Sequence, residues 1–212
     1  MATTAIAVCA GLIAAVLAIW VLPRFLEPSA EGQKPDVLVR AAFLLPIPYG
    51  VLGFWQRDHM DWVEMAFAGT ALWFLYVLSV TDLRRKIVPN RLLLWMGGIF
   101  LGLTGLSFLG GAEAGLERLI LAGIGSVLMG LVFLIAYFLS RRQLGGGDVK
   151  LVALMGLYLT ATRIVGAVFY GLLLCAIFSI VQMVRKKLGR KDGVPLVPFL
   201  FIGTFLCYLF RL

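Results

Sequence analysis

Long apolar runs alternate with short charged or turn-rich stretches along the whole chain. Most runs approach the roughly 20 apolar residues with which a helix crosses a bilayer. Two are shorter: the second contains Pro46 and Pro48 and is expected to be kinked, tilted or re-entrant, and the sixth is too short for the roughly 30 Å hydrocarbon core. The pattern predicts about eight membrane segments, at residues 4–22, 41–55, 65–82, 91–110, 119–139, 149–161, 164–184 and 194–210.

The composition agrees with this pattern. The 212 residues are 61% hydrophobic and 14% charged, with a mean hydropathy of +0.99, whereas soluble domains are about 45 to 50% apolar. No basic region precedes the first apolar run, which we expect to be a retained span and not a cleaved signal peptide. The sequence therefore predicts an all-α membrane protein, a polytopic helical bundle forming one membrane domain.

The basic residues predict the orientation of the bundle. The formal net charge is +8, and Lys and Arg accumulate in cytoplasmic loops of membrane proteins. With the N-terminus outside, the predicted inner loops hold all of the 19 basic residues except Arg57, Arg118, Arg163 and Arg211. We expect the basic loops to face anionic membrane lipids, so the charge does not indicate a nucleic-acid partner.

The three cysteines do not indicate a metal site. Cys9, Cys175 and Cys207 lie singly inside apolar runs, without a CxxC pair or a partner at ligand spacing. We interpret them as packing residues and expect neither a metal nor another cofactor.

Two aspartates lie at the ends of predicted membrane segments. Asp82 lies in TDLRRKIVPN after the third segment, and Asp148 lies in LGGGDVKL before the sixth. A carboxylate at membrane depth costs about 2.5 to 3.5 kcal/mol on insertion scales, so its default interpretation is functional. Two segments separate the aspartates, so both are expected at the same membrane face, which the basic loops make cytoplasmic.

A purely structural role for each aspartate is the alternative. Asp148 would cap a helix, and Asp82 would pair with Arg85 or Lys86. The residues around them favour function: three consecutive glycines leave room for an extended peptide at an entropic cost, and Pro89 with Asn90 makes the connection after Asp82 short and ordered. The glycines are Gly145, Gly146 and Gly147.

The two elements together resemble the type IV prepilin peptidases, intramembrane aspartyl proteases of the GxGD class that include the archaeal preflagellin peptidases. The resemblance lies in TDLRRKIVPN, with Asp82, Pro89 and Asn90, and in GGGDVKL, with Gly145, Gly147, Asp148 and Lys150. It covers residues 65–212, including VPLVPFLFIG, which looks like the family's proline-rich last-helix motif with a valine where a glycine is commoner. Residues 1–64 are N-terminal membrane segments of unassigned role.

The resemblance implies that Asp82 and Asp148 are a catalytic pair that cleaves the short basic leader from a prepilin or pilin-like precursor. It also implies that cleavage takes place at the cytoplasmic boundary of the inner membrane and serves type IV pilus assembly or protein secretion. Charge repulsion supports such a pair, because two carboxylates about 4 Å apart repel by about 4 kcal/mol at a dielectric near 20 and would share one proton. Lys150 is either a membrane-face anchor or a group that tunes the pair and contacts substrate. Site-shaping roles are implied for Gly145, Gly146, Gly147, Pro89 and Asn90.

One departure from the family and two other functions bear on this hypothesis. Many bacterial members carry an insert with two CxxC pairs that accompanies N-methylation, and because this chain lacks it we expect a short, peptidase-only enzyme. A proton-coupled transporter using Asp82 and Asp148 as proton carriers is the main alternative. It predicts an inverted repeat and midplane carboxylates, and the sequence has no evident repeat. A noncatalytic scaffold of a secretion system is the third hypothesis.

Overall fold

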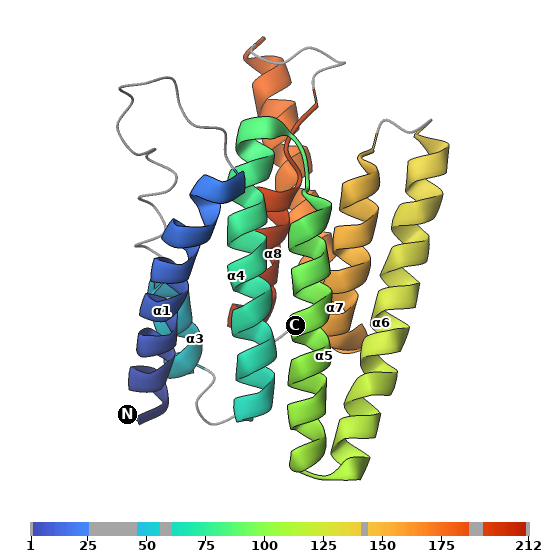
Figure 1. Cartoon of the computed structure of the whole chain (residues 1–212). Helices are drawn as coiled ribbons and strands as arrows, with labels where there is room; N and C mark the ends of the chain where they lie inside the picture. The colour runs from blue at the N-terminus through green and yellow to red at the C-terminus, as the bar shows by residue number, and fades with distance from the viewer. Residues whose placement is uncertain (1, 26–45, 56–60, 141–143, 187–192, 211–212) are drawn as a thin grey trace.

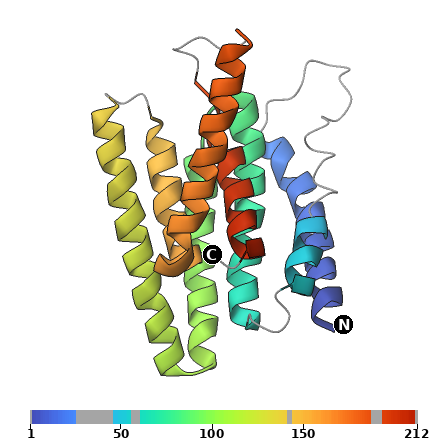
Figure 2. The same cartoon turned by 180° about the vertical axis from the view of Figure 1, so that it is seen from behind.

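The computed structural model describes residues 2–25, 46–55, 61–140, 144–186 and 193–210. All regular elements in these ranges are helices (Figures 1 and 2). They are α1 (Ala2–Phe25), α3 (Pro46–Trp55), α4 (Trp62–Arg85), α5 (Asn90–Leu109), α6 (Ala112–Leu139), α7 (Gly146–Val184) and α8 (Val197–Phe210).

The helices have the length and surface of a multi-pass membrane protein. Five of them, α1, α4, α5, α6 and α7, are long and apolar enough to cross a membrane, and α8 is apolar but shorter. Their outer faces expose large apolar side chains, such as Leu94, Leu109 and Leu139, as expected where lipid is the solvent. The predicted all-α membrane fold is confirmed, whereas the count of eight segments and the orientation stay predictions.

The helix ends agree with most predicted segments. The second predicted segment, 41–55, is helical over Pro46–Trp55, and residues 41–45 lie outside the described residues. The sixth and seventh predicted segments, 149–161 and 164–184, fall within α7, whose backbone is broken at Thr160. Figures 1 and 2 show the chain reversing direction near this break, so that the second arm of α7 runs back toward the end of the bundle at which the first arm begins. The first arm is about 20 Å long at 1.5 Å per residue.

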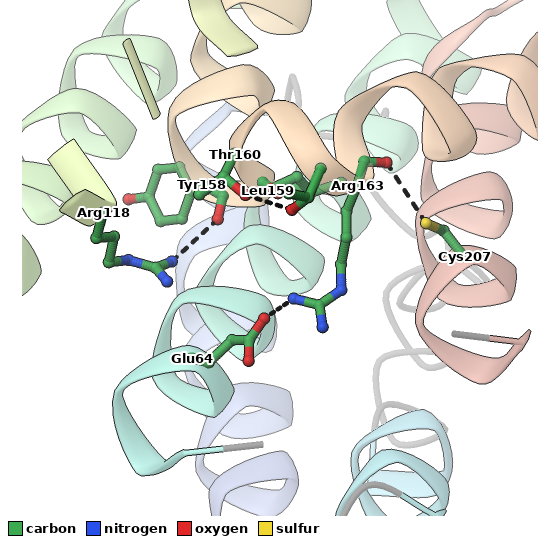
Figure 3. Close-up of polar contacts among 8 residues, drawn as sticks. Glu64, Arg118, Tyr158, Leu159, Thr160, Arg163 and Cys207 are labelled. Carbon is green, nitrogen blue, oxygen red and sulfur yellow. Dashed lines mark hydrogen bonds and ion pairs between the residues drawn. The ribbon is translucent and has the colours of Figure 1, made fainter. Parts of the chain in front are cut away.

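The break in α7 lies at Thr160, a residue type that rarely adopts the backbone conformation found there. Thr160 has φ 60° and ψ 175°, and such angles are strained for a β-branched residue. Its hydroxyl donates to the Leu159 carbonyl over 2.6 Å, and Arg118 of α6 donates to the Tyr158 carbonyl over 3.2 Å, as Figure 3 shows. The Arg118 guanidinium also lies 3.6 Å from the Phe67 ring centroid. One local and one tertiary hydrogen bond therefore satisfy the carbonyl groups next to the break.

The second arm of α7 is fixed to two other helices just after the break. The Arg163 guanidinium forms an ion pair with Glu64 of α4, and the Arg163 carbonyl accepts a hydrogen bond from Cys207 Sγ of α8 over 3.4 Å (Figure 3). These contacts and those of Arg118 come from three helices. Together they hold the chain on both sides of the break at Thr160.

Glycines let the longest helices approach closely. A Cβ at Gly156 of α7 would lie 2.5 Å from the carbonyl carbon of Gly125 in α6, and a Cβ at Gly125 would lie 2.7 Å from the Thr160 carbonyl carbon. Between α8 and the second arm of α7, a Cβ at Gly203 would lie 2.8 Å from Gly171 Cα. Small residues allow such backbone contacts between membrane helices, which associate by van der Waals packing.

The described N-terminal helices pack against α4. Trp73 of α4 donates its indole N–H to the Ala14 carbonyl of α1 over 2.8 Å. Tyr49 of α3 donates its hydroxyl to the Gly69 carbonyl, and its ring occupies the space that a side chain at Gly69 would need. The described part of residues 1–64 thus contributes to the same core as α4, with Ala18, Leu22 and Tyr49 buried.

Candidate active site

The two sequence motifs lie at the same end of the bundle. The C-terminal end of α4, the start of α5, the start of α7 and the start of α8 are all at the top of Figure 1 and of Figure 2. Asp82 lies in the last turn of α4 and Asp148 in the first turn of α7. Their carboxylates are close enough for Coulombic repulsion to act between them.

Asp82 is held against the start of α8. Its side chain is 6% exposed, and its Oδ2 accepts a hydrogen bond from the Val197 N–H over 3.0 Å, with a further backbone hydrogen bond from Leu196. Val197 is the first residue of α8. Unpaired N–H groups and the helix dipole stabilise negative charge at such a position. The Asp82 side chain therefore joins two helices far apart in sequence.

Lys86 also bonds the end of α4 to the residues just before α8. It ends α4 in the left-handed conformation, with φ 51° and ψ 39°, and its N–H donates to the Asp82 carbonyl over 2.8 Å. Its ammonium group donates to the Gly193 carbonyl over 2.9 Å. Residues 193–197 are thus bonded to the end of α4 both through Lys86 and through Asp82.

Asp148 lies inside the first turn of α7, where Gly145 occupies the N-cap position. The Asp148 N–H donates to the Gly145 carbonyl over 3.0 Å, and the side chain is partly exposed. The alternative of a purely structural role predicted that Asp148 is the N-cap of this helix. In the structure the N-cap is Gly145. The helix N-terminus still favours a negative charge there.

Each glycine of the GGGD element has a different environment. A Cβ at Gly145 would lie 2.8 Å from Asp148 Oδ2, and one at Gly147 would lie 2.9 Å from Val88 Cβ, whereas one at Gly146 would meet nothing within 4 Å. None of the three has a positive φ. The glycines therefore supply space in this structure: for the carboxylate, for the connection after α4, and for an open surface beside Asp148.

The predicted site-shaping residues connect the two motifs. Pro89 is the N-cap of α5 and Asn90 its first residue. Lys150 donates from its ammonium group to Asn90 Oδ1 over 3.2 Å. This contact, together with that of Gly147 and Val88, ties the first turn of α7 to the connection that follows Asp82.

Sequence reasoning did not single out several residues of this site. Lys86 was considered as a determinant of orientation or as an ion-pair partner of Asp82, and not as a donor to the Gly193 carbonyl. Val88 faces Gly147, and the donors of Leu196 and Val197 are backbone groups. The signal that could have found the last two is VPLVPFLFIG, whose resemblance to a family motif carried no assigned role. Within the described ranges, no three His, Cys, Asp or Glu side chains gather so as to hold a metal ion.

Fold and site together define a multi-pass helical membrane protein with two carboxylates at the same end of the bundle. Residues 69–180 match the type IV leader peptidase family, and this range is just over half of the chain and includes both aspartates. The chain belongs to the type IV leader peptidase family, and the predicted membership is confirmed.

Two curated relatives are similar to about two thirds of the chain. The prepilin leader peptidase/N-methyltransferase of Bacillus subtilis (strain 168) is 28% identical over 143 residues, covering 64% of this chain and 52% of the relative. The protein of the same name from Aeromonas salmonicida (strain A449) is 29% identical over 140 residues, covering 65% of this chain and 46% of the relative. The matched region thus spans about half the length of these relatives. No solved structure matches the chain significantly.

Proposed function

We propose that this protein is a membrane-embedded aspartyl endopeptidase that removes the leader from prepilin or pilin-like precursors at the cytoplasmic boundary of the inner membrane. The observation that supports it most directly is that Asp82, in the last turn of α4, and Asp148, in the first turn of α7, lie at the same end of the bundle, inside the region that matches the type IV leader peptidase family. Asp82 and Asp148 are too far apart in the sequence for local structure to place them at the same end of the bundle.

The proposed chemistry follows from two carboxylates that share a proton. The ionised carboxylate acts as general base on a water molecule, and the protonated one polarises the scissile carbonyl and then donates to the leaving amine. The negative charge has backbone support on both sides: Asp82 accepts from Val197 at the start of α8, and Asp148 lies in the first turn of α7. A helix N-terminus therefore stabilises a negative charge on either aspartate. The pair is best treated as one titrating unit.

The other residues of the site have positioning roles in this proposal. Lys150 and Asn90 hold the start of α7 against the start of α5, and Pro89 fixes the backbone before α5. Gly145 and Gly147 leave room for the Asp148 carboxylate and for Val88, and Gly146 leaves the surface open to a substrate backbone. The predicted substrate has a short basic leader in water and a long apolar helix in lipid, which suits a site at the end of a membrane bundle.

A purified-protein assay tests this function. The full chain in phosphatidylcholine vesicles is incubated with a panel of prepilins, and leader release is followed by mass spectrometry. We expect one cut per precursor at the boundary between leader and apolar helix, and, following the absence of the paired-cysteine insert, no N-methylation when S-adenosylmethionine is added. A folded protein that cuts no precursor, but moves protons in a manner dependent on the two aspartates, would instead favour the transporter.

The glycine run offers a second, more local prediction. In Gly147→Ala the new methyl group meets Val88 Cβ, so the two motifs must shift apart and kcat is expected to fall about tenfold. Gly146→Ala meets no atom of the protein and is expected to keep kcat within about twofold while raising KM, because the methyl group occupies the open surface beside Asp148. The control is Gly98→Ala on α5, which also meets nothing within 4 Å. Equal kcat values for the Gly147 variant and the parent would contradict this interpretation.

A further inference from the structure

An apolar groove runs along the outside of α1, α4 and α5. It encloses about 560 Å³ and is lined by side chains that include Leu17 and Trp20 of α1, Trp73 of α4, and Trp95 and Ile99 of α5. Leu17, Trp20 and Trp95 are about half exposed, at 47%, 56% and 53%. The groove therefore opens toward the outside of the bundle, where the hydrocarbon of a membrane would be.

A second cavity of about 520 Å³ adjoins the groove at the end of the bundle that holds the aspartates. Arg24, Arg85 and Arg91 line it, from the ends of α1 and α4 and the start of α5 (Figure 1), together with Pro89 and Asn90. None of the lining residues that the structure describes is acidic. Three arginine residues around one cavity favour an anionic ligand, because arginine binds phosphate oxygens through paired N–H groups.

The cavity and the groove share a lining residue. Trp95 lines both. Trp20 lines the groove, and the Arg24 guanidinium of the basic cavity lies 3.3 Å from the Trp20 ring centroid. A single ligand that fills both spaces must therefore carry a negative group at one end and an apolar chain at the other.

We propose that the cavity and groove together bind an anionic glycerophospholipid, with its phosphate and headgroup among Arg24, Arg85 and Arg91 and an acyl chain along Trp20 and Trp95. The charge of the cavity favours this ligand over other molecules that could fill the groove. A basic prepilin leader would be repelled by the arginines, and a second copy of this chain would bring a further net charge of +8. Tryptophan and arginine side chains are also the usual contacts of a membrane protein at the headgroup level.

The bound lipid would contact the candidate active site. Pro89 and Asn90 line the basic cavity, and Asn90 accepts the hydrogen bond from Lys150 that links α5 to the first turn of α7. A headgroup seated there supports the start of α5 from the side opposite α7. Binding itself does not depend on the proposed peptidase activity, so the two can be tested separately.

The test measures lipid binding to the purified full chain by native mass spectrometry and by the shift of its thermal unfolding. Dioleoyl-phosphatidylglycerol is compared with dioleoyl-phosphatidylcholine, which has the same chains but no net charge, and with dihexanoyl-phosphatidylglycerol, which keeps the headgroup but shortens the chains. We expect the long-chain anionic lipid to bind at least about tenfold more tightly than either, since both the phosphate and the chain are recognised. Equal binding of the two dioleoyl lipids would overturn the proposal.

A matched pair of variants locates the site. Arg24→Gln with Arg91→Gln removes two charges from the cavity, and Arg185→Gln with Lys186→Gln removes two charges from the end of α7, outside it. The first pair is expected to weaken phosphatidylglycerol binding about tenfold and the second to leave it unchanged. Unchanged binding in the first pair would overturn the site, as would a photo-crosslink from position 95 to the apolar helix of a prepilin in place of lipid.

Discussion

Asp82→Asn and Asp148→Asn are each expected to abolish leader cleavage, with a loss of at least about a thousandfold in kcat/KM. Asparagine keeps the size of the side chain and can still accept the Val197 N–H at position 82, but it can neither take a proton from water nor share one with its partner. The measurement is leader release by each purified variant, followed by mass spectrometry over several hours.

The control for these variants removes a carboxylate far from the pair. Glu113→Gln changes an exposed residue in the first turn of α6, at the opposite end of the bundle (Figure 1), and it is expected to cleave like the parent. Thermal unfolding of all three variants shows whether the fold is kept. Cleavage persisting in either single aspartate variant would rule out a mechanism that needs both carboxylates.

Gly156→Ala is expected to lower the free energy of unfolding by about 2 to 3 kcal/mol. The new methyl group would lie 2.5 Å from the Gly125 carbonyl carbon. Because this carbon is a backbone atom and cannot rotate away as a side chain could, α6 and the first arm of α7 must separate. That arm carries Asp148, so loss of cleavage is expected to accompany the loss of stability.

Gly123→Ala is the matched control, since a methyl group there meets nothing within 4 Å. Inside a helix, alanine is favoured over glycine by roughly 0.5 to 1 kcal/mol, so this variant is expected to be as stable as the parent or slightly more stable. The two variants are compared by thermal unfolding in the same detergent. Equal stability of the Gly156 variant and the parent would show that the helices do not meet closely at this point.

The sequence by itself determined the features that depend on local composition. Apolar runs of membrane length predict helices because the bilayer leaves backbone groups no partner but their own helix, and the described helices agree with them. Two intervening segments were enough to predict that Asp82 and Asp148 share one end of the bundle. The motifs around them were enough to identify the family.

Tertiary structure decided the features that depend on contacts across the sequence. Thr160 is neither glycine nor proline, and α7 reverses there because Arg118, Glu64 and Cys207, from three other helices, hold the chain around the break. Asp82 meets Val197 across 115 positions of sequence, and no local preference encodes that contact. The same holds for the contact of Gly147 with Val88 and for the groove beside Trp95. Helices are determined by nearest neighbours and by the membrane, whereas the site is determined by which helices pack together.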